Sequence, residues 1–476
     1  MKFFLLILSS FILYHPVFSQ DVFKSENYTL QGKGISFQLI GSFNNENVQY
    51  VYHNSKHKIL WQNDKLELTH ETILEAIPAD ISKLKILKNN EVLFVFFQVE
   101  KNKMTHLFVQ KINTNYEVSS PILLDSIAQD KSIENFEIVH SASENIFLTF
   151  SWSQQLANEN AVLTAKAWDV NFNELNNLKQ EFSTNEKFEI VNAGVSNQAH
   201  IFLILAEKKS TKGTVEAISF LTKLKNETLA IEQVNLKGYS WSGVQLAQNE
   251  IDNDLFFIGG FFHQNRYQAP EGIFMLAYNL KSKTFITENY SALSAQLSYK
   301  KDVLRDMHMR QMLLQEDGGI TFISEKYYDV VQTIDRNAGM SMNMGMMSPI
   351  QTKMIKEYYY NDVMLFSFHA DGKLKWSQTI VKNQFSSDDN GIFSSFGTLM
   401  HNYGNVIIFN DFNNRFSRNM AGFISSDGQM SIKELPDMPN AKTGEVIWQY
   451  AKQISNNSII APLLSGSSIS FVKIKF

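Results

Sequence analysis

A short motif recurs along this chain at a nearly constant spacing, and the repeat constrains the fold more than any other feature. A polar or glycine turn precedes a short apolar run, as in NNEVLFVFF, SENIFLTFSW and NDLFFIGGFF. The first apolar residues of the clear copies are Val92, Ile146, Ile201, Leu255, Ile320, Val406 and Ile459. Their spacings are 54, 55, 54, 65, 86 and 53 residues, and a weaker copy, ENVQYVYHN, lies around Val48. Periods of this length are typical of repeat architectures.

One period contains four predicted strands. In the first, Phe136, Ile138 and His140 alternate with Glu137 and Val139, so the two sets lie on opposite faces. The apolar run that begins at Ile146 follows, and the segments AVLTAKAWDV and LNNLKQEF complete the unit. A repeated unit of four short strands is typical of a β-propeller blade. The continuous apolar run predicts an inner strand that is packed on both faces.

The repeat count predicts eight blades if the Val48 copy is a true repeat, and seven if it is not. The last unit, residues 446–476, has room for only three strands. We expect residues 28–38 to supply the missing strand and close the ring, which removes the exposed edges. Tandem β-sandwiches are the alternative architecture. The pattern excludes a mainly helical fold, and residues 291–308 are the one segment that could form a helix.

The N-terminus predicts export. One lysine, a largely apolar run from Phe3 to Tyr14 and the end Val17-Phe18-Ser19 are typical of a secretory signal, residues 1–19. Residues 20–476 are then expected to form a single propeller domain, periplasmic, outer-surface or secreted. No later run is long enough for an integral membrane helix. The chain has no cysteine, and export without cysteine indicates a bacterial envelope or secreted protein.

Net charge and missing motifs exclude several function classes. The formal net charge of −5 argues against nucleic acid and anionic membranes as partners. The chain lacks the G-x-S-x-G, H-E-x-x-H and G-x-x-x-x-G-K-S/T motifs. A carbohydrate-active hydrolase with paired carboxylates at the central channel stays open as the alternative function, because a propeller gathers residues from distant parts of the chain.

The 86-residue spacing contains an insertion, residues 324–360, which is expected to form a long hairpin. The tip sequence NAGMSMNMGMM places Met340, Met342, Met344, Met346 and Met347 between glycine-containing turns. Thioethers suit Cu(I), but no histidine lies between His308 and His369. Flexible methionines also make adaptable contacts with a partner. We interpret this tip as a contact surface.

Tyrosines are concentrated in the same hairpin. Tyr358, Tyr359 and Tyr360 on the returning strand oppose Tyr327 and Tyr328 on the outgoing one. Such side chains could stack on sugars, or could form cross-strand pairs that stabilise the hairpin. The tyrosines of the returning strand join the methionines as candidate partner contacts.

Metal sites are weakly indicated. Asp388 and Asp389 offer clustered oxygens for calcium, but without the alternating pattern of a dedicated loop. His53 and His57 have a spacing seen in zinc sites, but they flank a predicted hairpin turn. Asp252 and Asp254 are expected to be solvent-facing turn residues. No metal or other cofactor is therefore expected.

Residues 357–384, EYYYNDVMLFSFHADGKLKWSQTIVKNQ, resemble a stretch of uncharacterised exported β-propeller proteins of Bacteroidetes-type bacteria. Asp371-Gly372 and Trp376 match their turn and tryptophan, and Asp427-Gly428 is a second, fainter copy of the turn. The pattern is also similar to quinoprotein-like and outer-membrane-assembly propellers, but the vicinal cysteines of quinoprotein dehydrogenases are missing. The resemblance implies fold and compartment and assigns no activity.

The sequence thus predicts an exported, all-β, eight-bladed propeller with one long protruding hairpin. We expect a binding or scaffolding module rather than an enzyme, with a protein or glycan as its partner.

Overall fold

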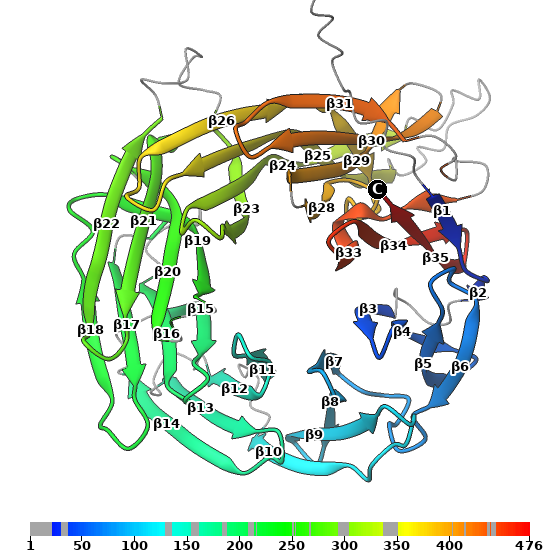
Figure 1. The fold of residues 1–476 in the computed structure, drawn as a ribbon, viewed down its shortest axis with the longest axis horizontal. Coiled ribbons are helices and arrows are strands. Elements are labelled where there is room, and N and C mark those ends of the chain that lie inside the picture. Colours follow the sequence, from blue (N-terminus) through cyan, green and yellow to red (C-terminus); the bar gives the residue numbers. More distant parts are fainter. Residues whose placement is uncertain are drawn as a thin grey trace, which may run out of the picture.

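The computed structural model describes residues 21–29, 37–128, 136–153, 161–182, 188–207, 214–215, 217–249, 252, 254–265, 268–293, 304–336, 351–401, 403–413, 416–435, 438 and 444–476. These residues form eight antiparallel sheets arranged in a ring around a central axis (Figure 1). Six sheets have four strands, one has five and one has six. The protein is therefore an eight-bladed β-propeller, and the Val48 copy of the repeat is a true blade.

The strands follow the chain from blade to blade. Blade 1 comprises β3 (Phe37–Phe43), β4 (Glu46–His53), β5 (Lys56–Gln62) and β6 (Leu68–Ile73). Blade 2 comprises β7 (Lys83–Lys88), β8 (Val92–Lys101), β9 (Met104–Asn113) and β10 (Ile122–Ala128). Blade 3 comprises β11 (Glu137–His140), β12 (Ile146–Ser153), β13 (Ala161–Asp169) and β14 (Glu174–Phe182). Blade 4 comprises β15 (Phe188–Val195), β16 (Ile201–Glu207), β17 (Ala217–Lys223) and β18 (Ala230–Val234).

The second half of the ring repeats this plan. Blade 5 comprises β19 (Ser240–Gln248), β20 (Leu255–His263), β21 (Gly272–Asn279) and β22 (Thr284–Ala292). Blade 6 comprises β23 (Met307–Leu314), β24 (Ile320–Arg336), β25 (Gln351–Phe368), β26 (Leu374–Ile380) and β27 (Gln384–Ser387). Blade 7 comprises β28 (Phe396–His401), β29 (Gly404–Asn413), β30 (Phe416–Ser425) and β31 (Met430–Glu434). Blade 8 comprises β1 (Asp21–Lys24), β2 (Tyr28–Thr29), β32 (Glu445–Val446), the 3-10 helix η2 (Trp448–Tyr450), β33 (Lys452–Ser455), β34 (Ser458–Ser465) and β35 (Ser468–Lys475).

The apolar run of each repeat forms the second strand of its blade, counted from the axis. The eight runs predicted from the sequence fall in β4, β8, β12, β16, β20, β24, β29 and β34. On β16, Leu203 and Leu205 pack toward blade 3, whereas Phe202 and Ile204 pack toward blade 5. Both faces of this strand are therefore buried, which explains why its apolar run is continuous.

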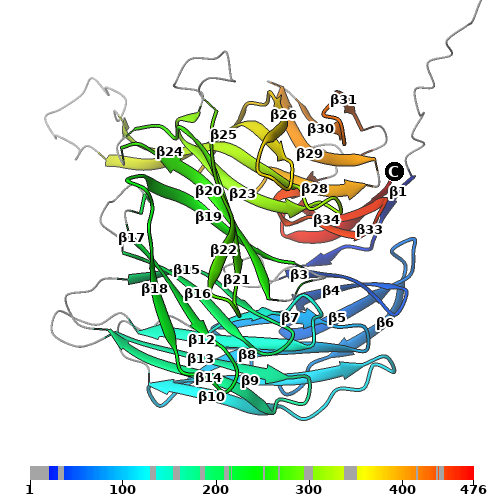
Figure 2. The same ribbon diagram turned by 60° about the vertical axis from the view of Figure 1, so that its left-hand side comes forward.

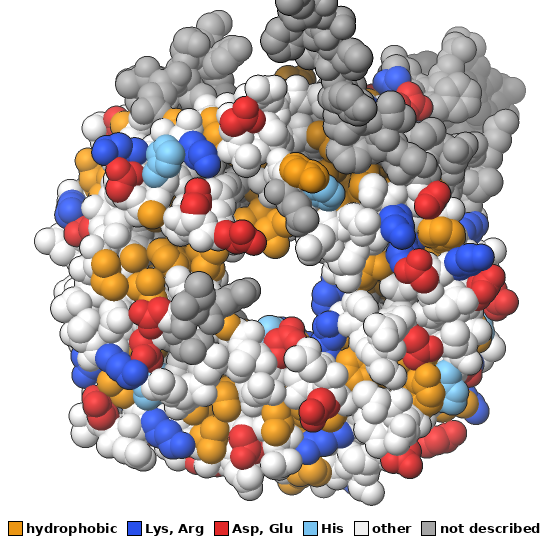
Figure 3. All heavy atoms as spheres, viewed as in Figure 1, with side chains coloured by type: hydrophobic (Ala, Val, Ile, Leu, Met, Phe, Trp, Pro, Cys, Tyr) orange, Lys and Arg blue, Asp and Glu red, His pale blue; other side chains and the backbone are white. Residues whose placement is uncertain are grey.

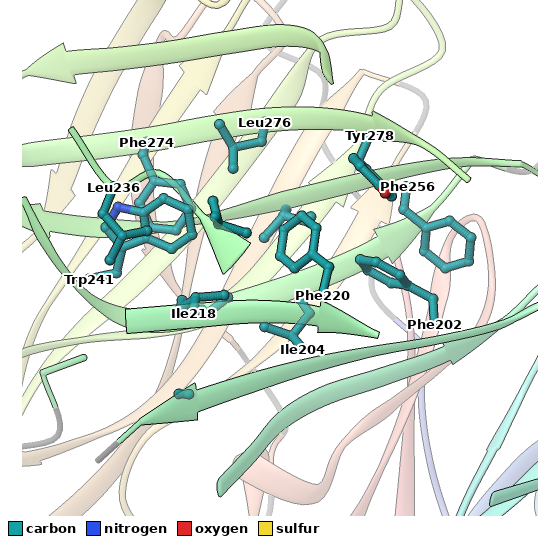
Figure 4. Close-up of a cluster of buried hydrophobic side chains, with 14 of the residues drawn as sticks. Phe202, Ile204, Ile218, Phe220, Leu236, Trp241, Phe256, Phe274, Leu276 and Tyr278 are labelled. Atoms are coloured by element: carbon teal, nitrogen blue, oxygen red, sulfur yellow. The ribbon is translucent and has the colours of Figure 1, made fainter. Parts of the chain in front are cut away.

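Eight hydrophobic clusters hold the ring together, one between each pair of adjacent blades. The cluster between blades 4 and 5 is rich in aromatic side chains (Figure 4). In it, Trp241 stacks on Phe274 with ring centroids 3.9 Å apart, and Phe202 packs edge-on against Phe220. Aromatic pairs of this kind contribute more than their buried area alone.

The two ends of the described chain close the ring within blade 8. β1 pairs with β35 from Asp21↔Lys475 to Lys24↔Val472, and β2 adds the pair Tyr28↔Ile469. The prediction of closure by an N-terminal strand is correct. Within the predicted residues 28–38, Tyr28 and Thr29 do pair in blade 8, Phe37 and Gln38 do not, and residues 30–36 lie outside the described residues. Gln38 belongs to β3 and pairs with Tyr50 inside blade 1, so the closing strand must lie earlier in the chain.

The long hairpin of blade 6 is longer than predicted. β24 and β25 pair continuously from Ile320↔Phe368 to Arg336↔Gln351, apart from a bulge between Glu325 and Tyr327. The two strands reach beyond their neighbours at one side of the ring (Figure 2). The segment 291–308 begins at the end of β22 and ends in β23, so the described parts of this segment give no support to a helix.

Deleting residues 21–29 should destabilise the whole ring. The deletion removes the buried side chain of Tyr28 and the contacts of the partly buried Val22 and Phe23 with the core. Full burial of one apolar side chain is worth about 1.5–3 kcal/mol. We expect one cooperative unfolding transition, at a temperature lower by roughly 5 °C or more, in thermal melts followed by circular dichroism. The exposed substitution Asn27→Ala is the control and should leave the melt unchanged. An early transition separate from the main one would contradict closure by this strand.

Candidate functional site

The part of blade 6 that lies beyond the bulge is the most distinctive surface of the ring. We call it the extension: residues 327–336 of β24, residues 351–360 of β25, and β27. β27 pairs with β25 from Tyr360↔Gln384 to Glu357↔Ser387, so the extension is a three-stranded sheet. Bulges are common where a strand must change direction, and this one lies where the extension leaves the blade.

A buried group of charges holds the base of the extension, and we call it the anchor cluster. The carboxylate of Glu325 is fully buried and lies 2.7 Å from the ammonium of Lys382, which is buried as well. Arg310 Nε donates to this carboxylate at 3.0 Å, and the Ser395 hydroxyl donates at 2.7 Å. Burial lowers the pKa of Lys382, and the Glu325 carboxylate opposes that shift. Because Ser395 precedes β28, the anchor cluster fastens the extension to blade 7.

The tyrosines of the hairpin form cross-strand pairs, as one of the two interpretations predicted. Tyr327 lies against Tyr360 at 4.6 Å between ring centroids, with the Arg310 guanidinium 5.7 Å from the Tyr360 centroid. On the opposite face, Tyr328 stacks on Tyr359 at 4.7 Å, and Tyr359 contacts Phe385 of β27 at 5.2 Å. The first pair is packed into the base of the extension, whereas the second forms a half-exposed aromatic strip.

The two edges of the extension differ in their main-chain hydrogen bonds. On the β25 side, Lys356 N donates to the Asp388 carboxylate at 3.0 Å, and the Lys356 carbonyl accepts from Asp388 N at 2.9 Å. On the β24 side, the ladder with β23 ends at Lys326, and Tyr327 N donates to the Asp306 carbonyl at 2.9 Å. One edge is therefore capped, whereas the other loses its partner strand after Tyr327.

The direction of the free main-chain groups follows from these bonds. Tyr327 N points away from β25, and alternate residues of a strand direct their N–H and C=O groups to the same side. Asp329, Val331 and Thr333 therefore present their N–H and C=O groups outward, with no backbone partner among the described residues. Lys356 lies opposite Val331, and its N–H group points away from β24 toward Asp388. The main-chain groups of Val331 therefore point away from β25, as inferred from Tyr327.

Exposed apolar side chains flank this open edge. Val331 is 59% exposed, and Met354, which pairs with Thr333, is 73% exposed. Val330 on the other face and Phe385 of the aromatic strip are exposed as well. Sequence reasoning missed the open edge and Phe385, because only the pairing shows where β23 ends and where β27 begins.

The predicted contact residues of the hairpin have different outcomes. Met340, Met342, Met344, Met346 and Met347 lie outside the described residues, so their role stays a prediction.

The tyrosine candidates divide. Tyr358 and Tyr360 are only 6% and 8% exposed, which corrects their assignment as contacts with a partner. The Tyr358 hydroxyl donates to Asn390 at 2.9 Å, and Tyr360 packs against Arg310 and Lys382, so both side chains serve the base of the extension. Tyr359 is half-exposed on the aromatic strip, so its role as a partner contact stays a prediction.

The calcium candidates have structural roles. Asp388 caps Lys356 as described, and its carboxylate also lies 3.2 Å from the ammonium of Lys353. These donors lower the pKa of the Asp388 carboxyl. The Asp389 carboxylate accepts from Gly391 N at 2.8 Å, which closes a turn. Within the described residues, no group of three or more His, Asp or Glu side chains could hold a metal ion.

The other candidates from the sequence are also satisfied within the protein. The Tyr50 hydroxyl and His57 Nδ1 share a hydrogen bond of 2.7 Å, and His57 Nε2 lies 3.0 Å from the Pro78 carbonyl. His53 Nδ1 lies 2.6 Å from the Thr29 carbonyl. Asp254 was expected to face solvent, but it is 6% exposed and forms an ion pair of 2.5 Å with Lys281.

An open channel runs along the axis of the ring (Figure 3). The innermost strands line it, and side chains satisfy part of their unpaired inner edges. Gln38 of β3 donates to the Ile86 carbonyl at 2.7 Å and accepts from Ile86 N at 2.9 Å. Gln453 of β33 bonds both main-chain groups of Met400 in the same way, at 2.8 and 2.9 Å. The channel wall is therefore polar and held by bonds between blades.

The carboxylates of the innermost strands bear on the hydrolase alternative. Glu137, on β11, is held in an ion pair with Lys83. Burial and the Asp389 carboxylate raise the pKa of Glu445 on β32, so the hydrolase alternative stays a prediction. A separate cavity of about 810 Å³ lies beside β18 and is lined by Gln233, Asn235, Tyr239, Ser240 and Asn265 among others, with no acidic, basic or histidine side chain in its described lining. In the described part of the chain, none of the helices is long and apolar enough to cross a membrane.

Among known proteins, the chain is similar to solved structures. No family model and no curated protein matches the sequence. A prolyl endopeptidase structure matches with 9% identity and a TM-score of 0.37, over 84% of this chain and 55% of that one. A subtype N10 neuraminidase-like protein of A/little yellow-shouldered bat/Guatemala matches with 11% identity and a TM-score of 0.33, over 75% and 94%. A mutant of Synechocystis apocarotenoid oxygenase matches with 8% identity and a TM-score of 0.38, over 75% of each chain.

These structural neighbours are β-propeller-like proteins. The chain spans just over half the length of the prolyl endopeptidase. All three TM-scores are low, so the description of the fold rests on the eight sheets themselves, and no activity follows from the neighbours.

Glu325→Gln should destabilise the protein, because it leaves the buried Lys382 ammonium without its counter-charge. Removing one partner of a buried ion pair typically lowers the free energy of unfolding by about 3–5 kcal/mol. Asp329→Asn is the matched control, because it removes an exposed carboxylate paired with Lys356 and should cost much less than Glu325→Gln. Equilibrium unfolding in guanidinium chloride measures both changes. Equal costs for the two variants would contradict a structural role of the anchor cluster.

Proposed function

We propose that this protein is an exported binding or scaffolding propeller, in the bacterial envelope or secreted, that docks a partner protein on the extension of blade 6. The observation that carries the proposal is the open edge of β24. The same proposal includes export by the N-terminal signal peptide and the similarity of the protein to exported propellers of Bacteroidetes-type bacteria. Both parts come from the sequence.

The open edge specifies the shape of its occupant. Asp329, Val331 and Thr333 offer N–H and C=O groups at two-residue spacing, and an extended strand satisfies such a row completely. A partner segment would therefore add to the extension as a fourth strand. Its apolar side chains would contact Val331 and Met354 on one face and Val330 on the other, which removes exposed apolar surface from water.

The two edges of the extension differ, because only the β24 edge lacks a covering strand or side chain among the described residues. Natural proteins usually protect edge strands, and here β27 and Asp388 cover the β25 side. The anchor cluster and the tyrosine pairs keep the base rigid, so a partner meets a preformed edge and loses little ordering entropy on binding. A glycan would use hydroxyl contacts rather than this row of main-chain groups, so we favour a protein.

Val331→Pro should abolish docking while the ring stays folded. Proline removes the outward N–H of Val331, and the ladder with β25 does not use that group. Val331→Thr keeps the main chain and the β-branched shape, and it is the matched control. Each protein is used to capture partners from envelope extract, with mass spectrometry as the readout. Amide hydrogen exchange of β24 is then measured with and without the captured partner.

The proposal expects a partner that binds the wild type and Val331→Thr and is lost with Val331→Pro, together with slower exchange of the Asp329, Val331 and Thr333 amides. Equal capture by all three proteins would overturn docking on this edge. Sedimentation velocity of the purified protein adds a further outcome. A dimer that Val331→Pro abolishes would place a second copy on the edge and overturn the choice of a different protein.

Deleting residues 333–353 and bridging with Gly-Ser should weaken docking, because it removes Thr333 from the open edge, at little cost in stability. Thr333 and Lys353 are exposed, and the Lys353–Asp388 ion pair that is lost lies at the surface, where such pairs contribute little to stability. The anchor cluster and the tyrosine pairs remain. We expect thermal melts within about 2 °C of the wild type. A collapse in stability would show that the outer hairpin is part of the core rather than a docking element.

A further inference from the structure

Basic side chains gather along one side of the central opening (Figure 3). The innermost strands carry five basic residues, Lys83, Lys85, Lys88, Arg310 and Lys452, and three acidic ones, Glu137, Glu189 and Glu445. This local excess is opposite to the net charge of the whole chain, which is −5. Lys83 is paired with Glu137 and Arg310 with Glu325 of the anchor cluster, so Lys85, Lys88 and Lys452 are the basic residues of this set that these two ion pairs do not use.

Two of these lysines approach the same place from opposite sides. Lys88 ends β7 in blade 2, and its ammonium donates to the Ser42 carbonyl of β3 at 2.6 Å. Lys452 begins β33 in blade 8, and its Cε would lie 3.5 Å from a Cβ placed on Gly41 of β3. Two blades that flank blade 1 thus bring their ammonium groups to neighbouring residues of one innermost strand.

The donors at this place are incompletely used. Lys88 makes one hydrogen bond to the described residues, although an ammonium group has three donors. Lys85, on the same strand, donates to the Ile138 carbonyl of blade 3 at 2.6 Å. Lys452 is exposed to the channel, and its ammonium has no hydrogen-bond partner within the described ranges. Several N–H donors are therefore available to a bound molecule.

The pKa shifts of these lysines also indicate unbalanced positive charge. Surrounding protein lowers the pKa of Lys452, the neighbouring Lys88 lowers it further, and Glu144 in the turn after β11 opposes the shift. Burial also lowers the pKa of Lys85. Like charges held close in a partly dehydrated channel repel each other, and an anion between them would replace this repulsion with attraction.

We infer that the centre of the ring is a binding site for a compact ligand with at least two negative charges, held between Lys88 and Lys452 beside Gly41 and Ser42. Such a ligand could carry phosphate or carboxylate groups, since both accept hydrogen bonds from ammonium groups. The site is independent of the extension and of its partner.

The test is isothermal titration calorimetry of the full protein with pyrophosphate and, separately, with citrate. Lys452→Met and Lys88→Met should each weaken binding at least about tenfold, because each removes one charge-assisted contact. Lys433→Met, on the outermost strand β31, removes the same charge far from the channel and should leave binding unchanged. Raising the salt concentration from about 20 to about 200 mM should weaken binding to the wild type.

Each outcome decides the inference. Binding of pyrophosphate alone or of citrate alone supports the site and assigns its phosphate or carboxylate chemistry. No binding of either probe, or binding that both channel variants leave intact, overturns it. If Lys88→Met unfolds the protein because Ser42 loses its donor, Lys452→Met still decides, since the described residues give Lys452 no hydrogen bond to lose.

Discussion

Every blade of this protein depends on having two neighbours, because the second strand of each blade is apolar on both faces. On β16, for example, Phe202 and Ile204 face blade 5 while Leu203 and Leu205 face blade 3. A sheet with two apolar faces is stable only when both are covered, and a row of such sheets leaves two faces exposed unless it closes. Closure by β1 on β35 therefore supports all eight interblade clusters, including those far from the chain ends.

The edges that closure leaves are treated in three different ways. Inner edges along the channel are satisfied in part by side chains of adjacent blades, such as Gln38 and Lys85, and these side chains make the channel wall polar. The β25 edge of the extension is covered by β27 and Asp388. The edge of β24 around Val331 is left open. Both proposed sites arise at edges, because there main-chain and charged groups remain available to a ligand.

Several predictions from the sequence failed for one common reason. The closing strand was placed at residues 28–38, although Gln38 belongs to blade 1. Tyr358 and Tyr360 were assigned to a partner, although both are buried at the base of the extension. Asp254 was expected to face solvent, although it is buried beside Lys281. In each case the element was recognised, but its neighbours in space decided which side chains were covered.

The sequence by itself determined the repeat, the four-stranded unit and the long hairpin, and it limited the ring to seven or eight blades, because turns and apolar runs encode strands through local contacts. Only the tertiary structure decided which distant side chains meet. Lys88 meets Lys452, and Glu325 meets Lys382. In neither case does the sequence pattern around one residue indicate the other as its neighbour. The open edge of β24 likewise exists only because β23 ends its pairing at Lys326. The pattern of a strand is set by residues close in sequence. Which side chains meet, and where the pairing of two strands ends, depends on how the whole ring is assembled.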